Sequence, residues 1–278
     1  MEGLKTQDFT MTLPFETPHF ENDDQYEDWL AKSLNSKTGK MDKVDGINCP
    51  ICRNKGVIYG WDRETQSRFA ADCGCMAARQ SLRKLSRSDV CKDWRHKTFD
   101  SYTTTDQWQE IMKERILRYV KDDHRGWLYV SGQSGCGKTH LCTAALVDLV
   151  KQEALSGEYI RWMDMSEKLD AIRFSSDELE KFKHTLTTCD ILYLDDLFKK
   201  MRNAPISSRE FDNTLSIIDA RYKNPKLMTI ISGERTMEEL GQMDEAFAGR
   251  IHERCGKHIV QIKREVGRNY RLKKDELI

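Results

Sequence analysis

One short segment, GQSGCGKT at residues 132–139, restricts the possible folds of this chain more than any other stretch. It fits the phosphate-binding loop pattern G-x-x-x-x-G-K-[ST] at every specified position. Glycines let the backbone N–H groups of such a loop turn toward a triphosphate without Cβ clashes, and Lys138 offers a positive charge to the β- and γ-phosphate oxygens. Thr139 offers a hydroxyl to Mg²⁺, and a helix that begins here directs its positive end at the phosphates.

The residues on either side of this segment match the context that the motif requires. Residues 127–131 (WLYVS) predict a buried strand that enters the loop, and residues 141–150 predict an apolar helix that leaves it. A glycine-rich turn that contains Lys-Thr by chance is the alternative, and this context disfavours it. We therefore predict that the chain binds a nucleoside triphosphate. The expected nucleotide-binding residues are Gly132, Gln133, Ser134, Gly135, Cys136, Gly137, Lys138, Thr139 and His140.

A second motif, CDILYLDD at residues 189–196, is an apolar run that ends in two carboxylates. It is typical of a Walker B strand, a buried central strand whose carboxyl end presents acids to Mg²⁺ and to the attacking water. We predict that Asp195 holds the Mg²⁺ together with Thr139, and that Asp196 orients and deprotonates the water. A solvent-facing strand end is the alternative. We expect the phosphate loop and the two aspartates to lie at the ends of adjacent core strands.

Strands and helices alternate through the second half of the chain, which predicts an α/β fold. The five expected strands form a parallel sheet between helices, with the ligand at the carboxyl ends of the strands. These strands are residues 127–131, 158–162, 189–196, 226–232 and 258–262. The chain contains neither a guanine-recognition N-K-x-D nor an LSGGQ-like signature, which argues against GTPases and transport-type ATPases.

Two close pairs of cysteines, Cys49 with Cys52 and Cys73 with Cys75, flank a β-rich stretch. This layout is typical of a zinc ribbon, although the second pair is C-x-C instead of the commoner C-x-x-C. So short a module buries too little apolar surface to fold alone, so we expect a structural Zn²⁺ bound by four thiolates. Free structural thiols and a redox pair are the alternatives. A four-thiolate site leaves no open position for catalysis.

The remaining composition divides the chain into three predicted parts. Residues 1–48 form an acidic N-terminal arm with one short helix at residues 24–34, which either packs on the next domain or docks a partner protein. Residues 49–97 comprise the Cys₄ zinc module and a basic linker helix, and residues 98–278 the ATPase domain. The basic run at residues 79–97 suits either a solvated linker or contact with nucleic-acid phosphates, and both interpretations stay open.

The cellular location follows from what the sequence lacks. We find no uninterrupted apolar stretch near the roughly 18 residues of a membrane span, so we expect no membrane contact. Nine cysteines without a signal peptide indicate a reducing compartment. We predict a cytoplasmic protein.

Three segments carry a resemblance to a known family: the phosphate loop continued to Leu141, YLDDL at residues 193–197, and NYRL at residues 269–272. Together they resemble the DnaC-type helicase loaders of the AAA+ ATPases, and especially the phage and prophage forms with a cysteine-rich N-terminal segment. The resemblance covers residues 49–278. The related IstB-like transposition ATPases share the same core, and the cysteine module favours the loader.

This resemblance implies an ATP-hydrolysing DNA replication protein that loads a replicative hexameric DnaB-type helicase onto single-stranded DNA. It also implies self-association through the ATPase domain, in which an arginine finger completes the neighbouring site. Arg250 is the expected finger and Arg254 the fallback, unless these arginines simply pair with surface acids. Arg271 stands at the sensor-arginine position, and either Ser232 or Glu234 at the first sensor. The helical lid of many AAA+ proteins is expected to be reduced or absent.

Two other functions remain open at this stage. One is an IstB-like helper ATPase for transposition. The other is a nucleotide-gated adaptor in which hydrolysis is vestigial and the zinc module binds a partner protein.

Overall fold

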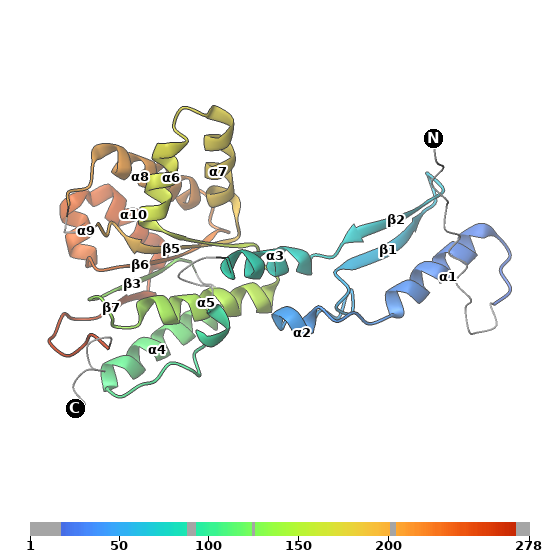
Figure 1. Cartoon of the computed structure of the whole chain (residues 1–278), viewed down its shortest axis with the longest axis horizontal. Coiled ribbons are helices and arrows are strands. Elements are labelled where there is room, and N and C mark those ends of the chain that lie inside the picture. The colour runs from blue at the N-terminus through green and yellow to red at the C-terminus, as the bar shows by residue number, and fades with distance from the viewer. Residues whose placement is uncertain (1–17, 88–92, 124–125, 201–203, 271–278) are drawn as a thin grey trace, which may run out of the picture. The chain divides into compact units, whose positions relative to one another are not determined.

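The computed structural model describes residues 18–87, 93–123, 126–200 and 204–270 of the 278-residue chain (Figure 1). They belong to two compact units. Unit 1 comprises residues 1–44 and 48–73, and unit 2 comprises residues 45–47 and 74–278. Unit 2 therefore includes the helix Cys75–Leu85, which the predicted division assigned to the zinc module. The division of the chain into an acidic arm, a zinc module and an ATPase domain stays a prediction.

Unit 1 is a helix packed on a β-hairpin. Helix α1 (Asp23–Ser36) begins where Asn22 accepts a hydrogen bond from the backbone of Gln25. Strands β1 (Val57–Asp62) and β2 (Ser67–Asp72) pair antiparallel, and α1 contacts β1. The amide of Asn35 pairs with both backbone groups of Tyr59, at 2.8 and 3.0 Å. Polar contacts thus join the helix to the hairpin. The short helix α2 (Asp42–Asp45) lies between α1 and β1 in the chain.

Unit 2 contains the predicted five-stranded parallel sheet, which is confirmed. Its strands are β3 (Leu128–Ser131), β4 (Gly157–Arg161), β5 (Ile191–Leu197), β6 (Met228–Gly233) and β7 (Ile259–Gln261). Their order is β4-β5-β6-β3-β7, and every neighbouring pair is parallel. One expectation was wrong: the strands that lead to the phosphate loop (β3) and to the aspartates (β5) are not adjacent, because β6 lies between them.

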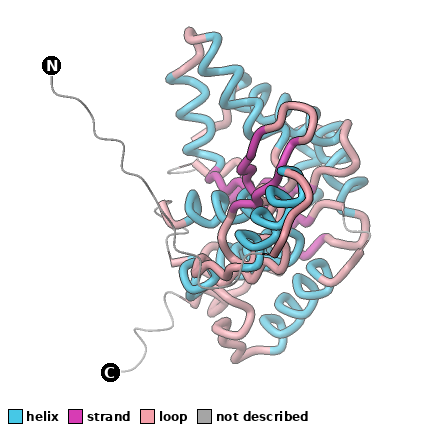
Figure 2. Tube along the Cα trace, turned by 90° about the vertical axis from the view of Figure 1, so that its right-hand side faces the viewer, coloured by secondary structure: helices cyan, strands magenta, loops and turns pink. Residues whose placement is uncertain are grey.

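Helices cover both faces of this sheet (Figures 1 and 2). One face carries α3 (Cys75–Leu85), α4 (Gln107–Val120) and α5 (Lys138–Glu153), with the 3₁₀ turn η1 (Trp94–His96) against α5. The other carries α6 (Trp162–Ala171), α8 (Ser208–Tyr222) and α10 (Glu245–Cys255), with α7 (Ser176–Thr188) on α8 and α9 (Met237–Met243) on α10. The apolar strands are therefore buried on both sides, as a parallel sheet requires.

The largest side chains of the core lie between the sheet and the α6, α8 and α10 layer. Trp127, Trp162 and Phe247 are fully buried there, and the indole N–H of Trp162 donates to Thr214 at 2.9 Å. This packing makes the sheet a rigid frame for the loops at its carboxyl edge. In the described residues no helix follows β7. Among the helices of the described ranges, none has the length and apolar character of a membrane span.

Candidate nucleotide site and cysteine centre

The phosphate loop connects the end of β3 to the first residue of α5, as the motif requires. Gly135 and Gly137 have φ angles of 78° and 92°, in the left-handed region that other residues rarely adopt. A Cβ atom on Gly137 would also lie 2.6 Å from the ring of Tyr102. Gly137 thus meets two separate requirements, one of backbone conformation and one of space.

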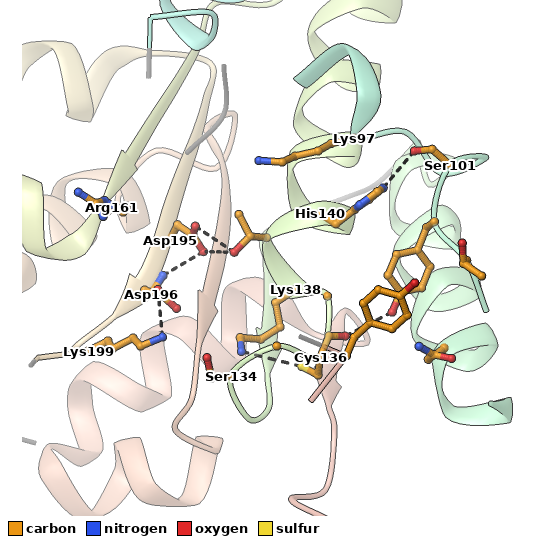
Figure 3. A pocket seen from close by; sticks show the side chains of 17 residues that line it. Lys97, Ser101, Ser134, Cys136, Lys138, His140, Arg161, Asp195, Asp196 and Lys199 are labelled. Atoms are coloured by element: carbon orange, nitrogen blue, oxygen red, sulfur yellow. Dashed lines mark hydrogen bonds and ion pairs between the residues drawn. The ribbon is translucent and has the colours of Figure 1, made fainter. Parts of the chain in front are cut away.

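Lys138 is buried at the N-terminus of α5, and its ammonium turns back over the loop. It donates hydrogen bonds to the carbonyl oxygens of Gly132 and Gln133, at 2.8 and 3.0 Å. Figure 3 shows Lys138 within the loop, with Asp195 on one side and His140 on the other. The positive charge therefore lies where the helix dipole is also positive, an environment that attracts phosphate.

Asp195 lies at the end of β5, 1% exposed, and faces the first turn of α5. The hydroxyl of Thr139 donates to its carboxylate, 3.2 Å from Oδ2 and 3.3 Å from Oδ1. Two oxygen ligands, one hydroxyl and one carboxylate, thus lie side by side next to the phosphate loop. Hard oxygen ligands of this kind suit Mg²⁺, so the residues present fit that ion.

Asp196 has a different environment from its neighbour. Its φ of 54° coincides with a register irregularity between Leu194 and Leu197 in the pairing of β5 with β6. Its carboxylate pairs with Lys199 at 3.3 Å, and Lys199 also pairs with Glu234 at 2.9 Å. Burial and the adjacent charge of Asp195 raise the pKa of Asp196 above its usual value. The backbone irregularity turns Asp196 away from the regular alternation of the strand.

These groups line a cavity of about 600 Å³, which continues past the phosphate loop to the segment before α4 and to Tyr270. Sequence analysis missed several of the lining residues: Lys97, Ser101, Tyr102, Thr103, Gln109, Arg161, Lys199 and Tyr270. Most have no fixed spacing from either motif, so only the fold brings them to the cavity. Tyr270 is the exception, because it belongs to the NYRL segment that carries the family resemblance.

His140 follows the phosphate loop and lines the same cavity. Its Nε2 lies 2.8 Å from the carbonyl oxygen of Thr98 and 3.3 Å from the hydroxyl of Ser101. Its ring meets that of Tyr102 edge to face, at 5.3 Å between centroids. Burial lowers the pKa of His140. The imidazole of His140 therefore connects α5 to the segment before α4 by contacts with Thr98, Ser101 and Tyr102.

The arginines predicted from the family resemblance lie outside this cavity or outside the described residues. Arg250 pairs with Asp219 at 2.7 Å. Arg254 donates to the backbone carbonyls of Asn224, Pro225 and Leu227 at 3.0–3.3 Å. Arg271 lies outside the described residues.

The two candidates for the first sensor differ in their surroundings. Ser232 is fully buried, and its hydroxyl donates to Asp195. Glu234 instead pairs with Lys199. Ser232 thus contacts the aspartate pair directly, whereas Glu234 is connected to it through Lys199, which also pairs with Asp196.

The four cysteines Cys49, Cys52, Cys73 and Cys75 are buried, and their sulfur atoms all lie within 4.8 Å of one another. In a tetrahedral site with Zn–S distances of about 2.3 Å, the sulfurs would be about 3.8 Å apart. The Cys49 and Cys73 sulfurs are 3.7 Å apart, so the residues fit a zinc ion. One backbone N–H supports the cluster, because Gly56 donates to the sulfur of Cys52 at 3.3 Å.

The parallel sheet, the phosphate loop and the acid at the end of β5 define a P-loop nucleotide-binding protein of the AAA+ class. A family model described as IstB-like ATP binding protein matches residues 75–277. The chain belongs to this family. It is also 31% identical, over 225 residues, to the phage-like element PBSX protein XkdC of Bacillus subtilis (strain 168), covering 78% of this chain and 82% of that protein. The predicted family resemblance is confirmed.

Two solved structures match part of this chain. Domain III of the replication initiation protein DnaA from Thermotoga maritima has a TM-score of 0.51 and 18% identity, covering 60% of this chain and 67% of that chain. A DnaC helicase loader has a TM-score of 0.49 and 21% identity, covering 62% of this chain and 99% of that chain. The match to the DnaA domain shows a shared AAA+ fold.

Proposed function

We propose that this protein hydrolyses ATP and loads a replicative hexameric DnaB-type helicase onto single-stranded DNA. The observation that carries the ATPase part is the contact of Thr139 with Asp195 next to the phosphate loop, at 3.2 Å. The loader part is supported by the likeness to XkdC, a protein of a phage-like element, and by the cysteine cluster that precedes the ATPase core. A loader works where DNA is replicated, which in a bacterium is the cytoplasm.

The chain's residues divide the work of hydrolysis. The phosphate-loop backbone and Lys138 bind the β- and γ-phosphates, and Thr139 and Asp195 hold the magnesium. Bound magnesium supplies positive charge that stabilises the phosphate oxygens during transfer. Asp196 orients the water, and its raised pKa makes it a stronger base than an ordinary aspartate. Arg250 of one subunit reaches the γ-phosphate of the next and stabilises the charge that develops there.

The cysteine cluster has a structural role in this proposal. Cys49, Cys52, Cys73 and Cys75 hold one Zn²⁺, which closes the hairpin β1–β2 at its base. Because all four positions are thiolates, the site keeps no place for a substrate.

The test of the ATPase part compares the wild type with Asp196→Asn. We expect the variant to bind ATP as tightly as the wild type, while phosphate release falls by about a hundredfold or more. Phosphate release by the wild type should be slow alone and rise with single-stranded DNA. Unchanged phosphate release in Asp196→Asn, or none in the wild type, would leave the nucleotide-gated adaptor as the better explanation.

The family match favours a second candidate, an IstB-like helper ATPase for transposition. The two candidates predict different partners. A loader should capture a purified DnaB-type helicase in the presence of ATP, whereas a transposition helper should capture a transposase and coat duplex DNA. Capture of the transposase but not of the helicase would reverse our preference.

A further inference from the structure

Three hydroxyl groups from three neighbouring strands meet at the carboxylate of Asp195. Tyr159 of β4 donates to it at 3.1 Å and Tyr193 of β5 at 2.8 Å, and Ser232 of β6 donates as well. Thr139 contacts the same carboxylate from α5. Tyr193, Ser232 and Asp195 are all buried. A buried carboxylate needs hydrogen-bond partners, and those of Asp195 come from three strands of the sheet and from α5.

The contacts are divided unequally between the two carboxylate oxygens. Oδ1 accepts from Tyr193, from Ser232 and from the backbone N–H of Asp196 at 3.1 Å. Oδ1 thus accepts from three groups of β5 and β6. Oδ2 accepts from Tyr159 of β4 and lies 3.2 Å from the Thr139 hydroxyl, which is 3.3 Å from Oδ1 and shares the expected magnesium site. A carboxylate held at both oxygens cannot rotate freely about its Cβ–Cγ bond.

We propose that Tyr193 is a positioning residue that fixes Asp195 so that Oδ2 stays directed at the magnesium site. Tyr193 stands two residues before Asp195 on β5, so both side chains lie on the same face of the strand. Its hydroxyl also lies 3.2 Å from that of Ser232, which completes a small network around Oδ1. This inference rests on the proposed function, because it assumes that Asp195 binds the metal.

The Tyr193 hydroxyl is protonated at neutral pH, as any phenol is, and donates to Asp195 at 2.8 Å. The ring of Tyr193 contacts that of Tyr159 edge to face, with 5.2 Å between centroids. Groups that hold a metal ligand by hydrogen bonds commonly change metal affinity about tenfold or more when they are removed.

The test is the magnesium dependence of nucleotide binding, measured with a fluorescent ATP analogue in the full-length protein. In Tyr193→Phe we expect the Mg²⁺ concentration for half-maximal tightening to rise about tenfold. Binding of the analogue without Mg²⁺ should stay at the wild-type level. If the variant loses both the Mg²⁺ response and the binding of the analogue without Mg²⁺, the substitution has caused a general packing defect, and the inference is overturned.

Tyr129→Phe is the matched control. Tyr129 is an equally buried tyrosine in the same sheet, and its hydroxyl donates at 2.6 Å to the carbonyl of Arg235 instead of to Asp195. We expect its Mg²⁺ response to be that of the wild type. An equal shift in both variants, or none in Tyr193→Phe, would overturn the role of Tyr193. If Mg²⁺ does not change the binding of the analogue to the wild type, the metal site itself is overturned. If the wild type shows a normal Mg²⁺ response but releases no phosphate, only the proposed hydrolysis is overturned.

Discussion

Arg250 and Arg254 lie one helical turn apart on α10, yet they have different surroundings. Arg254 donates to three backbone carbonyls at the end of the turn before β6, and its guanidinium lies over the ring of Trp127 at 5.5 Å. Within the described part of the chain, Arg250 pairs with Asp219, and both side chains of that pair are about 30% exposed. Arg254 therefore serves the fold, and Arg250 is the one that could exchange its partner for a phosphate.

We predict that Arg254→Met lowers the free energy of unfolding by about 2 kcal/mol, because carbonyls near Trp127 lose a charged donor. Arg250→Met should change it by less than about 0.5 kcal/mol, since a half-exposed ion pair contributes little. Urea unfolding of both variants measures the difference. Equal losses would contradict the distinction between the two arginines.

We further predict that Arg250→Ala binds ATP normally and loses hydrolysis by about a thousandfold, because the charge that develops on the γ-phosphate loses its cation. Mixing it with Asp196→Asn should restore part of the activity. The Arg250→Ala subunit keeps an intact nucleotide site, and the Asp196→Asn subunit keeps an intact arginine finger. When the two subunits assemble, the finger of the second completes the site of the first. Phosphate release that stays at background in the mixture would show that Arg250 does not act between subunits.

At the level of elements, helix α3 contains part of the predicted basic linker, and two of its basic residues make contacts within the protein. Arg79, one turn after Cys75, is fully buried and donates to both oxygens of Asp45 at 2.5 and 2.6 Å. It also donates to the sulfur of Cys75 at 3.4 Å. Lys84 pairs with Glu158 of β4. At least two charges of the basic run thus serve internal contacts, whereas Arg83 stays exposed and available to phosphates.

Arg79 should therefore affect how tightly zinc is held. We predict that Arg79→Lys speeds the transfer of zinc to a chromogenic chelator about tenfold, because lysine cannot reach Asp45 and the Cys75 sulfur at once. Arg83→Lys, on the exposed side of the same helix, is the control and should release zinc at the wild-type rate. Identical rates in all three proteins would remove Arg79 from the support of this centre.

Most elements could be predicted from the sequence because their signals are local. The strands that end in the phosphate loop and in Asp195 carry continuous apolar runs, and α8 begins with a capping box of Ser207 and Glu210. The strand order could not be predicted, since periodicity says that a strand is buried and not which strand lies beside it. For this reason the insertion of β6 between β3 and β5 was missed.

On the scale of the whole molecule, the two units depend on different forces. Unit 2 has a continuous apolar core around Trp127 and Trp162. In unit 1 every residue of β2 is exposed, and α1 has no buried residue. A hairpin with so little buried surface gains little from the hydrophobic effect, so we expect a metal ion in the cysteine cluster to supply much of its stability.

We predict that removal of zinc opens unit 1 and leaves the sheet of unit 2 intact. After chelation, trypsin should cut rapidly at Arg63 and Arg68, which in the folded hairpin pair with Asp28 and Glu27 of α1. Mass spectrometry of the fragments and the retained binding of an ATP analogue would measure both parts. Protection of these arginines after complete zinc loss would contradict the structural role of the metal.

The sequence by itself determined the phosphate loop, the acid pair, the cysteine cluster and the α/β class. Each is specified by residue types at close spacing, and the required chemistry leaves few substitutes. Only the tertiary structure decided which distant groups surround them: Tyr159 and Ser232 at Asp195, Tyr102 at Gly137, and Asp45 at Arg79. These contacts join separate segments and depend on strand order and helix packing, which the global balance of burial sets and no local pattern encodes.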